Sequence, residues 1–138
     1  MRIILLLFAL SLVLIGCGDK PPMPKLSVNH EKIDFELGSY FTKSFAKTVN
    51  SDSAAPPMLV KGLEPKTVVP ESSLLIEFNK KPKKIIISEW KDGKEGSQTT
   101  LEFNKFQLPK EKGTYIYSIR SEWKNGSSGT YAFVIKVE

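Results

Sequence analysis

The fold is decided by the last 25 residues of the chain, TYIYSIRSEWK at residues 114–124 and YAFVIKVE at residues 131–138. Large apolar side chains occupy every second position in both stretches, which is typical of β-strands. One face of the first stretch carries Tyr115, Tyr117, Ile119, Ser121 and Trp123. The intervening NGSSG, residues 125–129, has the composition of a hairpin turn. The segment therefore predicts a long β-hairpin with one buried face.

Shorter strands are predicted upstream of this hairpin. Alternating or β-branched patterns mark residues 73–78, 84–90, 99–103 and 105–108, with weaker candidates at 32–41 and 66–69. Asp92-Gly93 is a turn signal, and residues 55–60 can support at most one helical turn. Seven to nine short strands with frequent turns are typical of an all-β sandwich or barrel. We expect its centre to contain Leu74, Ile76, Phe78, Ile85, Ile87, Tyr115, Tyr117, Ile119, Phe133 and Ile135.

The stretch KEKGTYIY, residues 110–117, is similar to the acidic-x-Gly-x-Tyr-x-Cys segment that opens strand F of immunoglobulin domains. The resemblance implies that Tyr115 is a corner tyrosine whose hydroxyl bonds to upstream backbone, and that Tyr117 replaces the second cysteine. It also implies that Trp90 lies near the position of the core tryptophan. Both bridging cysteines are missing. The predicted fold is an Ig-like or fibronectin-like antiparallel β-sandwich of seven to nine strands.

The N-terminus has the parts of an export signal. Met1-Arg2 is followed by thirteen residues, Ile3 to Ile15, of which only Ser11 is polar. As a helix this run would span about 20 Å, whereas a transmembrane helix needs about 20 apolar residues. A membrane-spanning anchor is therefore disfavoured.

Leu14-Ile15-Gly16-Cys17 resembles a lipobox, the signature of bacterial lipoproteins. The resemblance implies a diacylglycerol thioether on the Cys17 sulfur and cleavage just before Cys17. Cys17 is the only thiol in the chain. The alternative is a small buried cysteine in an uncleaved signal anchor.

These features divide the chain into a signal peptide (1–16), a lipidated cysteine with a Pro-rich tether (17–25) and one β-sandwich domain (26–138), which we expect to be monomeric. The tether GDKPPMPK should act as an extended spacer of about 3 Å per residue. After cleavage, 122 residues remain with 19 basic and 15 acidic side chains, a net charge of +4. The expected location is the extracytoplasmic side of the cell membrane.

Several short strings resemble small lipoproteins of Bacillus-type Gram-positive bacteria. They are SAAPPMLVK at 53–61, FNKKP at 78–82, LPKEKGTY at 108–115, and the ending WKNG with YAF at 123–126 and 131–133. The resemblance covers residues 38–138. It implies a surface lipoprotein with an all-β domain, and it implies no catalytic residue.

The residues that carry chemistry do not form a recognisable catalytic or metal site. His30 is the only histidine, and Asp34 and Glu36 near it would share one solvent face of a strand. No Gly-x-Ser-x-Gly or phosphate-binding Gly-rich loop is present. The acids Glu77, Glu89, Glu102 and Glu122 are expected on outward strand faces. No catalytic residue, metal or cofactor is therefore predicted.

The strongest charge feature is the basic cluster Lys80, Lys81, Lys83 and Lys84 around Pro82. It would attract anionic headgroups or wall polymers, or it is a solvated turn whose lysines prevent edge pairing, which we favour. Nucleic acid is not an expected partner, because arginine and interleaved aromatic residues are missing. Trp90 and Trp123 could stack on a sugar or peptide, although Trp123 has the inward parity of a core residue.

The sequence thus predicts a membrane-anchored, extracytoplasmic lipoprotein that acts as a non-catalytic binding or interaction module. Its partners would be the membrane, through the lipid, and an envelope protein or an anionic wall polymer. The alternatives are a cell-envelope enzyme and an inhibitor or accessory subunit of another envelope protein. An enzyme should have a concave pocket with converging polar groups, and a binding module an exposed apolar patch.

Overall fold

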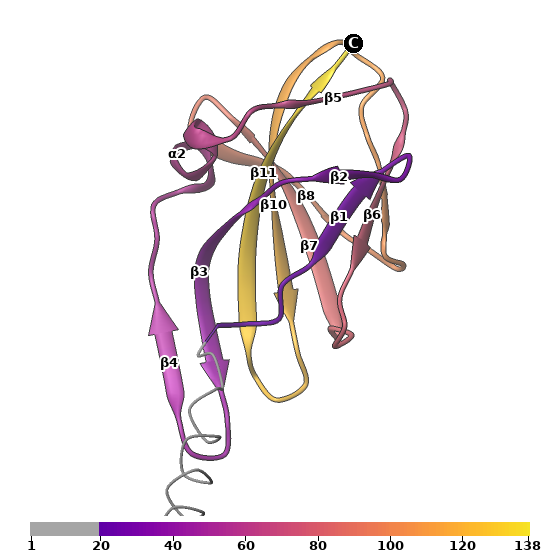
Figure 1. Cartoon of the computed structure of the whole chain (residues 1–138). Helices are drawn as coiled ribbons and strands as arrows, with labels where there is room; N and C mark the ends of the chain where they lie inside the picture. Colours follow the sequence, from indigo (N-terminus) through magenta and orange to yellow (C-terminus); the bar gives the residue numbers. More distant parts are fainter. Residues whose placement is uncertain (1–19) are drawn as a thin grey trace, which may run out of the picture.

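Two β-sheets packed face to face form the domain, as a computed structural model of the chain shows (Figure 1). The structure describes residues 20–138. The predicted signal peptide, the lipobox residues Leu14, Ile15 and Gly16, and the predicted lipidation site Cys17 lie outside the described residues. Within residues 20–138 there is no helix with the length and apolar character needed to cross a membrane.

The smaller sheet has four strands in the order β2-β1-β6-β9. They are β2 (Glu31–Ile33), β1 (Lys25–Val28), β6 (Ser73–Glu77) and β9 (Lys105–Gln107). Asn29 and His30 both have positive φ angles, of 50° and 66°, which gives a tight turn between β1 and β2. Predicted strands 73–78 and 105–108 are confirmed.

The larger sheet has the order β4-β3-β11-β10-β7-β8, and β5 pairs with β11 in parallel. Its strands are β3 (Glu36–Lys43), β4 (Thr48–Ser51), β5 (Lys66–Val68), β7 (Lys84–Lys91), β8 (Lys94–Thr100), β10 (Gly113–Glu122) and β11 (Ser128–Val137). The long C-terminal hairpin is confirmed, with Tyr117 opposite Phe133. The described residues contain eleven strands where seven to nine were expected, because β1 and β4 had no strong pattern and residues 32–41 form two strands.

The main core lies between the two sheets. Seven of the ten residues predicted for its centre are buried, and Phe78, Ile85 and Tyr115 pack against it while partly exposed. Leu26, Ile33, Leu108, Trp123 and Tyr131 add to it. The inward parity predicted for Trp123 is confirmed, since only 3% of the residue is exposed.

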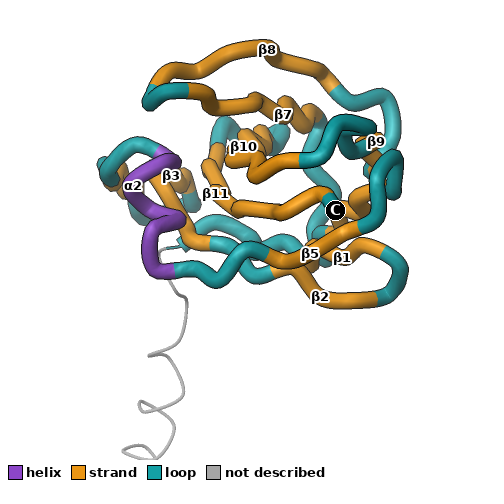
Figure 2. The backbone as a smooth tube through the Cα atoms, turned by 90° about the horizontal axis from the view of Figure 1, so that it is seen from above, coloured by secondary structure: helices purple, strands orange, loops and turns teal. Residues whose placement is uncertain are grey.

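A second, smaller apolar cluster lies on the outer face of the larger sheet. The single helical turn α2 (Pro56–Leu59) and the 3₁₀ turn η2 (Val60–Gly62) pack there against β11 (Figure 2). Val60, Ala132 and Val134 are buried in this cluster. The expectation that the hairpin buries only one face is therefore wrong for β11, because α2 and η2 cover its outward-facing Ala132 and Val134.

The corner tyrosine predicted from the immunoglobulin resemblance is present. The Tyr115 hydroxyl donates a hydrogen bond to the backbone oxygen of Glu111 at 2.7 Å. Tyr117 is buried and stacks on Phe133, with ring centroids 5.5 Å apart. The domain is an all-β sandwich with an Ig-like corner and no disulfide among the described residues.

Trp90 lies on the predicted strand, β7, but not in the core. It is partly buried opposite Ile116, and its Nε1 donates to the Ser118 hydroxyl at 2.9 Å. The residue of β7 that points into the core is Ile87, which is 1% exposed. Ile86, Ser88 and Trp90 alternate with Ile87, so the same period of two that buries Ile87 turns the indole to the outer face.

The strand predicted at residues 99–103 is displaced. Strand β8 ends at Thr100, and residues 101–104 cross from the larger sheet to β9 in the smaller one. All seven residues of β8 are exposed, so this edge strand has no apolar alternation to reveal it. Its charged residues Lys94 and Glu95 fit the usual protection of a sheet edge.

Candidate functional site

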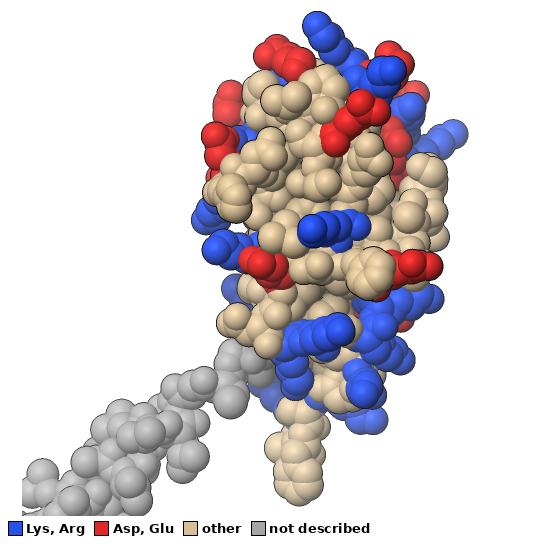
Figure 3. Space-filling model, turned by 90° about the vertical axis from the view of Figure 1, so that its right-hand side faces the viewer, with Lys and Arg blue, Asp and Glu red and all other residues tan. Residues whose placement is uncertain are grey.

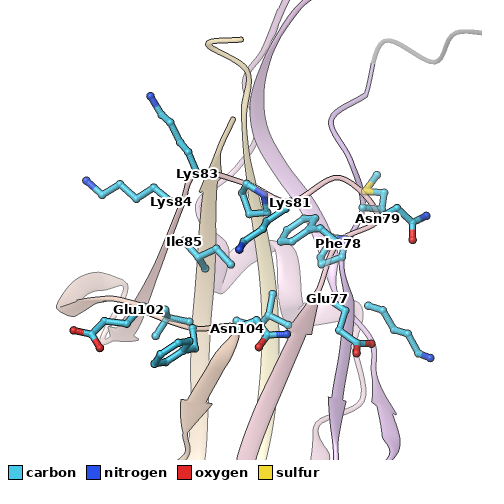
Figure 4. Close-up of a pocket in the computed structure, with 16 residues that line it drawn as sticks. Glu77, Phe78, Asn79, Lys81, Lys83, Lys84, Ile85, Glu102 and Asn104 are labelled. Atoms are coloured by element: carbon cyan, nitrogen blue, oxygen red, sulfur yellow. The ribbon is translucent and has the colours of Figure 1, made fainter. Parts of the chain in front are cut away.

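An open groove lies where the two sheets separate, between the β6–β7 turn and the crossing segment 101–104 (Figure 4). Its volume is about 1120 Å³, somewhat above the usual range for small-molecule pockets. The apolar part of its lining comes from Met23, Ile76, Phe78, Ile85, Leu101 and Phe103. Among the described residues this groove is the best candidate for a binding site.

The β6–β7 turn forms one wall of the groove, and hydrogen bonds to the end of β10 and the residue after it hold this turn in place. Trp123 Nε1 donates to the backbone oxygen of Lys80 at 2.8 Å, and Lys83 N donates to the oxygen of Glu122 at 2.8 Å. Phe78 meets Trp123 edge to face, with ring centroids 5.3 Å apart. The turn is therefore held in one position, and so is the Phe78 ring at the groove.

The crossing segment 101–104 forms the other wall. It is attached at both ends, because Leu101 N donates to Ile85 O and Ile76 N donates to Asn104 O, each at 2.9 Å. Between these bonds Phe103 is 77% exposed. A second hollow of about 530 Å³ shares this segment. The segment therefore exposes an aromatic ring next to open space on a firmly attached backbone.

Four lysines surround the groove: Lys25, Lys81, Lys83 and Lys84. None of them forms an ion pair with a residue between 20 and 138. In Figure 4 the Lys81 side chain hangs between Phe78 and Ile85, whereas Lys83 and Lys84 point away. A groove lined by lysine ammonium groups and by apolar side chains can bind a ligand that combines an anionic group with an apolar one.

The four acids considered in the sequence divide into two pairs. Glu77 and Glu102 lie on opposite sides of the groove and point away from its centre (Figure 4). Glu122 is 3.6 Å from Arg120, and Glu89 is 3.6 Å from Lys91. The outward position predicted for Glu89 is wrong, because it lies opposite Tyr117 on the inward parity of β7 and is partly buried.

The residues considered as metal ligands do not gather. His30 lies in the tight β1–β2 turn, and Lys32 is 3.5 Å from Asp34. Across residues 20–138 no group of three or more His, Cys, Asp and Glu side chains is close enough together to hold a metal ion.

Two buried tyrosines, Tyr117 and Tyr131, stay protonated, and Tyr131 donates a hydrogen bond. Burial raises the pKa of Tyr131 and of Tyr117 well above the usual value, and the Glu89 carboxylate raises the pKa of Tyr117 further. The Tyr131 hydroxyl donates to the backbone oxygen of Pro22. Pro21 and Pro24 are buried. The described part of the predicted spacer, residues 20–25, thus packs on the sandwich instead of extending away from it.

Sequence reasoning placed the basic cluster in a turn between two strands, and the structure confirms that position. The sequence pattern does not predict the groove, because it places Phe78 in the core and Phe103 on a strand. One sequence feature does indicate that Phe103 is exposed. It lies between the polar residues Glu102 and Asn104, and the next position of the same parity, Lys105, is charged.

Comparison of the chain with protein-family models, with curated proteins and with solved structures finds no match. The groove is therefore interpreted from its own residues.

Proposed function

We propose that the protein is a lipid-anchored, extracytoplasmic binding module whose groove holds an acidic, partly apolar peptide segment of another envelope protein. The observation that carries the proposal is the position of Lys81, without an ion-pair partner among residues 20–138, between Phe78 and Ile85. An exposed apolar and basic hollow of this size is typical of an interaction site.

The lining favours a peptide over an anionic wall polymer. A phosphate-rich polymer would use the lysines and leave Phe78, Leu101 and Phe103 in water. A peptide with carboxylates next to apolar side chains would use both parts of the lining. Aromatic residues, phenylalanine among them, are enriched at the cores of protein interfaces.

The anchor is supported by the lipobox-like residues Leu14, Ile15 and Gly16 before Cys17, and by the resemblance to lipoproteins of Bacillus-type bacteria. Two acyl chains on Cys17 would hold the protein stably, since single chains bind membranes only marginally. Replacement of Cys17 by alanine should abolish incorporation of radiolabelled palmitate and cleavage before residue 17. Normal labelling of Cys17→Ala would overturn the anchor.

Photo-crosslinking on intact cells tests the groove. The full chain would carry benzoylphenylalanine at Phe103, in the groove, or at Val69, which is 62% exposed near the C-terminus. We expect the Phe103 position to give a discrete protein adduct that the Val69 position does not give. A ladder of polymer adducts, identical adducts from both positions or no adduct would contradict the proposal.

A charge reversal links any adduct to the groove. Lys81→Glu in the Phe103-labelled chain should reduce the yield at least tenfold, because it places a carboxylate where the acidic ligand would bind. Lys94→Glu makes the same charge change on the exposed strand β8 and should leave the yield unchanged. Equal effects of the two substitutions would indicate a long-range charge effect and not a groove.

A further inference from the structure

Three turns meet at one end of the sandwich, and we call this end, made of residues 43–47, 79–84 and 123–127, the basal end. The turns connect β3 to β4, β6 to β7 and β10 to β11, and they lie together at the bottom of Figure 1. Asn125 Nδ2 donates to Lys43 O at 3.0 Å, and Lys43 N donates to the Ser127 hydroxyl at 2.9 Å. With the Trp123–Lys80 bond described above, the three turns form one connected platform.

The basal end concentrates positive charge. Its turns contain seven lysines and no acidic residue: Lys43, Lys47, Lys80, Lys81, Lys83, Lys84 and Lys124. The rest of the predicted mature chain has 12 basic and 15 acidic side chains, a net charge of −3. Figure 3 shows the lysines gathered at the lower end of the molecule. The domain is therefore strongly polarised along its length.

An aromatic ring projects from the same end. Phe45 occupies the tip of the β3–β4 turn, between Ser44 and Ala46, and is fully exposed at 109% of its reference area. The turn is closed by a hydrogen bond from Ser44 N to Lys47 O at 2.8 Å. An apolar ring held out on a closed turn between lysines has the composition of an interfacial membrane anchor.

The predicted anchor is close to this end, a step that rests on the proposed function. Pro21 packs beside Gly129 at the start of β11, where a Cβ on the glycine would be 3.0 Å from its Cγ atom. Cys17 and Lys20 are three positions apart, a distance of at most about 10 Å when the chain is extended. The Debye length at moderate salt is about 8–10 Å, so over this distance the attraction between lysines and anionic headgroups is not fully screened.

We propose that the basal end docks on the anionic surface of the bilayer, with Phe45 inserted between the headgroups and the lysines of this end other than Lys81, which faces the groove, on the lipid phosphates. Charge complementarity and the short reach to Cys17 favour the bilayer over a soluble wall polymer. Docking holds the groove beside the membrane in a fixed orientation and leaves the C-terminal end facing outward.

Depth-dependent quenching tests this orientation. Full-length lipidated Phe45→Cys and Val69→Cys proteins, labelled with bimane, are reconstituted with brominated-lipid vesicles of neutral phosphatidylcholine or of equal parts phosphatidylcholine and phosphatidylglycerol. We expect quenching at position 45 only in the anionic vesicles, reduced at about 1 M salt, where the Debye length is about 3 Å, and none at position 69. Equal quenching at both positions, or none at position 45, would overturn the proposal.

Charge variants and a second polyanion complete the test. Lys80→Glu with Lys124→Glu should weaken docking at least 25-fold, since each lysine near an anionic surface strengthens binding about fivefold. Lys61→Glu with Lys110→Glu is the matched control and should have little effect. A response at position 45 to soluble polyglycerol phosphate but not to anionic vesicles would assign the basal end to a wall polymer and overturn membrane docking.

Flotation separates this proposal from the lipid anchor. A lipidated protein floats with neutral vesicles, so absence of flotation there contradicts the anchor. Quenching at position 45 is measured on the same protein preparations in anionic vesicles. If Cys17 carries no lipid and its thiol takes up bimane, the labelled cysteines are placed in a Cys17→Ser chain so that only the chosen position is labelled. Flotation without quenching overturns the docking alone.

Discussion

The two ends of the sandwich use their charges differently. At the end that carries the C-terminus, three lysines pair with acids: Lys66 Nζ is 2.8 Å from Glu31, Lys136 Nζ is 2.7 Å from Glu138, and Lys91 Nζ is 3.6 Å from Glu89. At the basal end, Lys43, Lys80, Lys81, Lys83, Lys84 and Lys124 form no ion pair within residues 20–138. Paired charges satisfy one another, whereas unpaired ones stay available to an outside anion.

The two ends also differ in how their loops are held. The basal turns are fastened by a buried indole that bonds to Lys80 and packs on Phe78. At the opposite end the Tyr115 hydroxyl bonds to Glu111 near the surface, and backbone hydrogen bonds join the loops, from Glu71 N to Pro109 O and from Leu108 N to Ser72 O. The basal end, which gathers seven lysines, thus relies on a buried side chain, whereas the opposite end relies on a surface hydroxyl and backbone bonds, and the following substitutions measure the difference.

The largest effect is expected from Trp123→Ala. The substitution leaves a cavity in the core and removes the hydrogen bond that holds the β6–β7 turn. Truncation of a buried tryptophan costs about 3–5 kcal/mol, a large part of the 5–15 kcal/mol that typically stabilises a domain. Urea unfolding of the full chain in detergent would measure the change, and hydrogen exchange of the Lys83 amide should accelerate.

Trp90→Ala is the matched control for that prediction. It removes the same side chain from the outer face of β7, where the indole is partly exposed and bonds to Ser118. We expect a clearly smaller loss of stability and no change in exchange at Lys83. Equal losses from the two substitutions would contradict the special role of Trp123 at the basal end.

A smaller effect is expected from Tyr115→Phe at the opposite end. The phenyl ring keeps its packing, and only the hydroxyl bond to Glu111 is lost, which typically costs about 0.5–1.5 kcal/mol. Tyr40→Phe is the control, because the Tyr40 hydroxyl has no hydrogen-bond partner within residues 20–138. Equal midpoints for Tyr115→Phe and wild type would show that the corner bond contributes nothing.

Much of the fold was predictable because the information is local. The alternation of Tyr115, Tyr117 and Ile119 specifies a half-buried strand, and the segment from Glu111 to Tyr115 specifies the corner. Strand β8 was not predictable in the same way, because its residues face water on both sides. The outward position of Trp90 depends on where β7 lies between its neighbours, which its own sequence does not determine.

The candidate sites were less predictable because they depend on distant segments. The lysines around Pro82 are visible in the sequence, but their place at the same end as Phe45 depends on contacts between distant turns, such as the hydrogen bonds between the β3–β4 and β10–β11 turns, 82 to 84 residues apart. The groove depends on the crossing of residues 101–104 between the sheets. A period of two indicates which way a side chain points, but not which strands will leave a gap.

The smallest effect, and the one that tests charge pairing most directly, is expected for the Glu31–Lys66 pair. Its hydrogen bond and the nearby positive charge hold the pKa of Glu31 below the ordinary value of 4.5. The folded-state pKa is thus below the unfolded one, so the pair stabilises the domain above about pH 4.5. This stabilisation is lost as the pH falls through the folded-state pKa.

Lys66→Gln should therefore lower the thermal midpoint slightly at pH 7 and not at all at a pH below the folded-state pKa of Glu31. Lys61→Gln removes the same charge from a lysine that forms no ion pair within residues 20–138 and should show no such convergence. If the thermal midpoints of the two variants instead change with pH in parallel, the Glu31–Lys66 pair adds no more to stability than an unpaired lysine does. The contrast between the two ends would then lie only in the number of their charges, and not in how those charges are used.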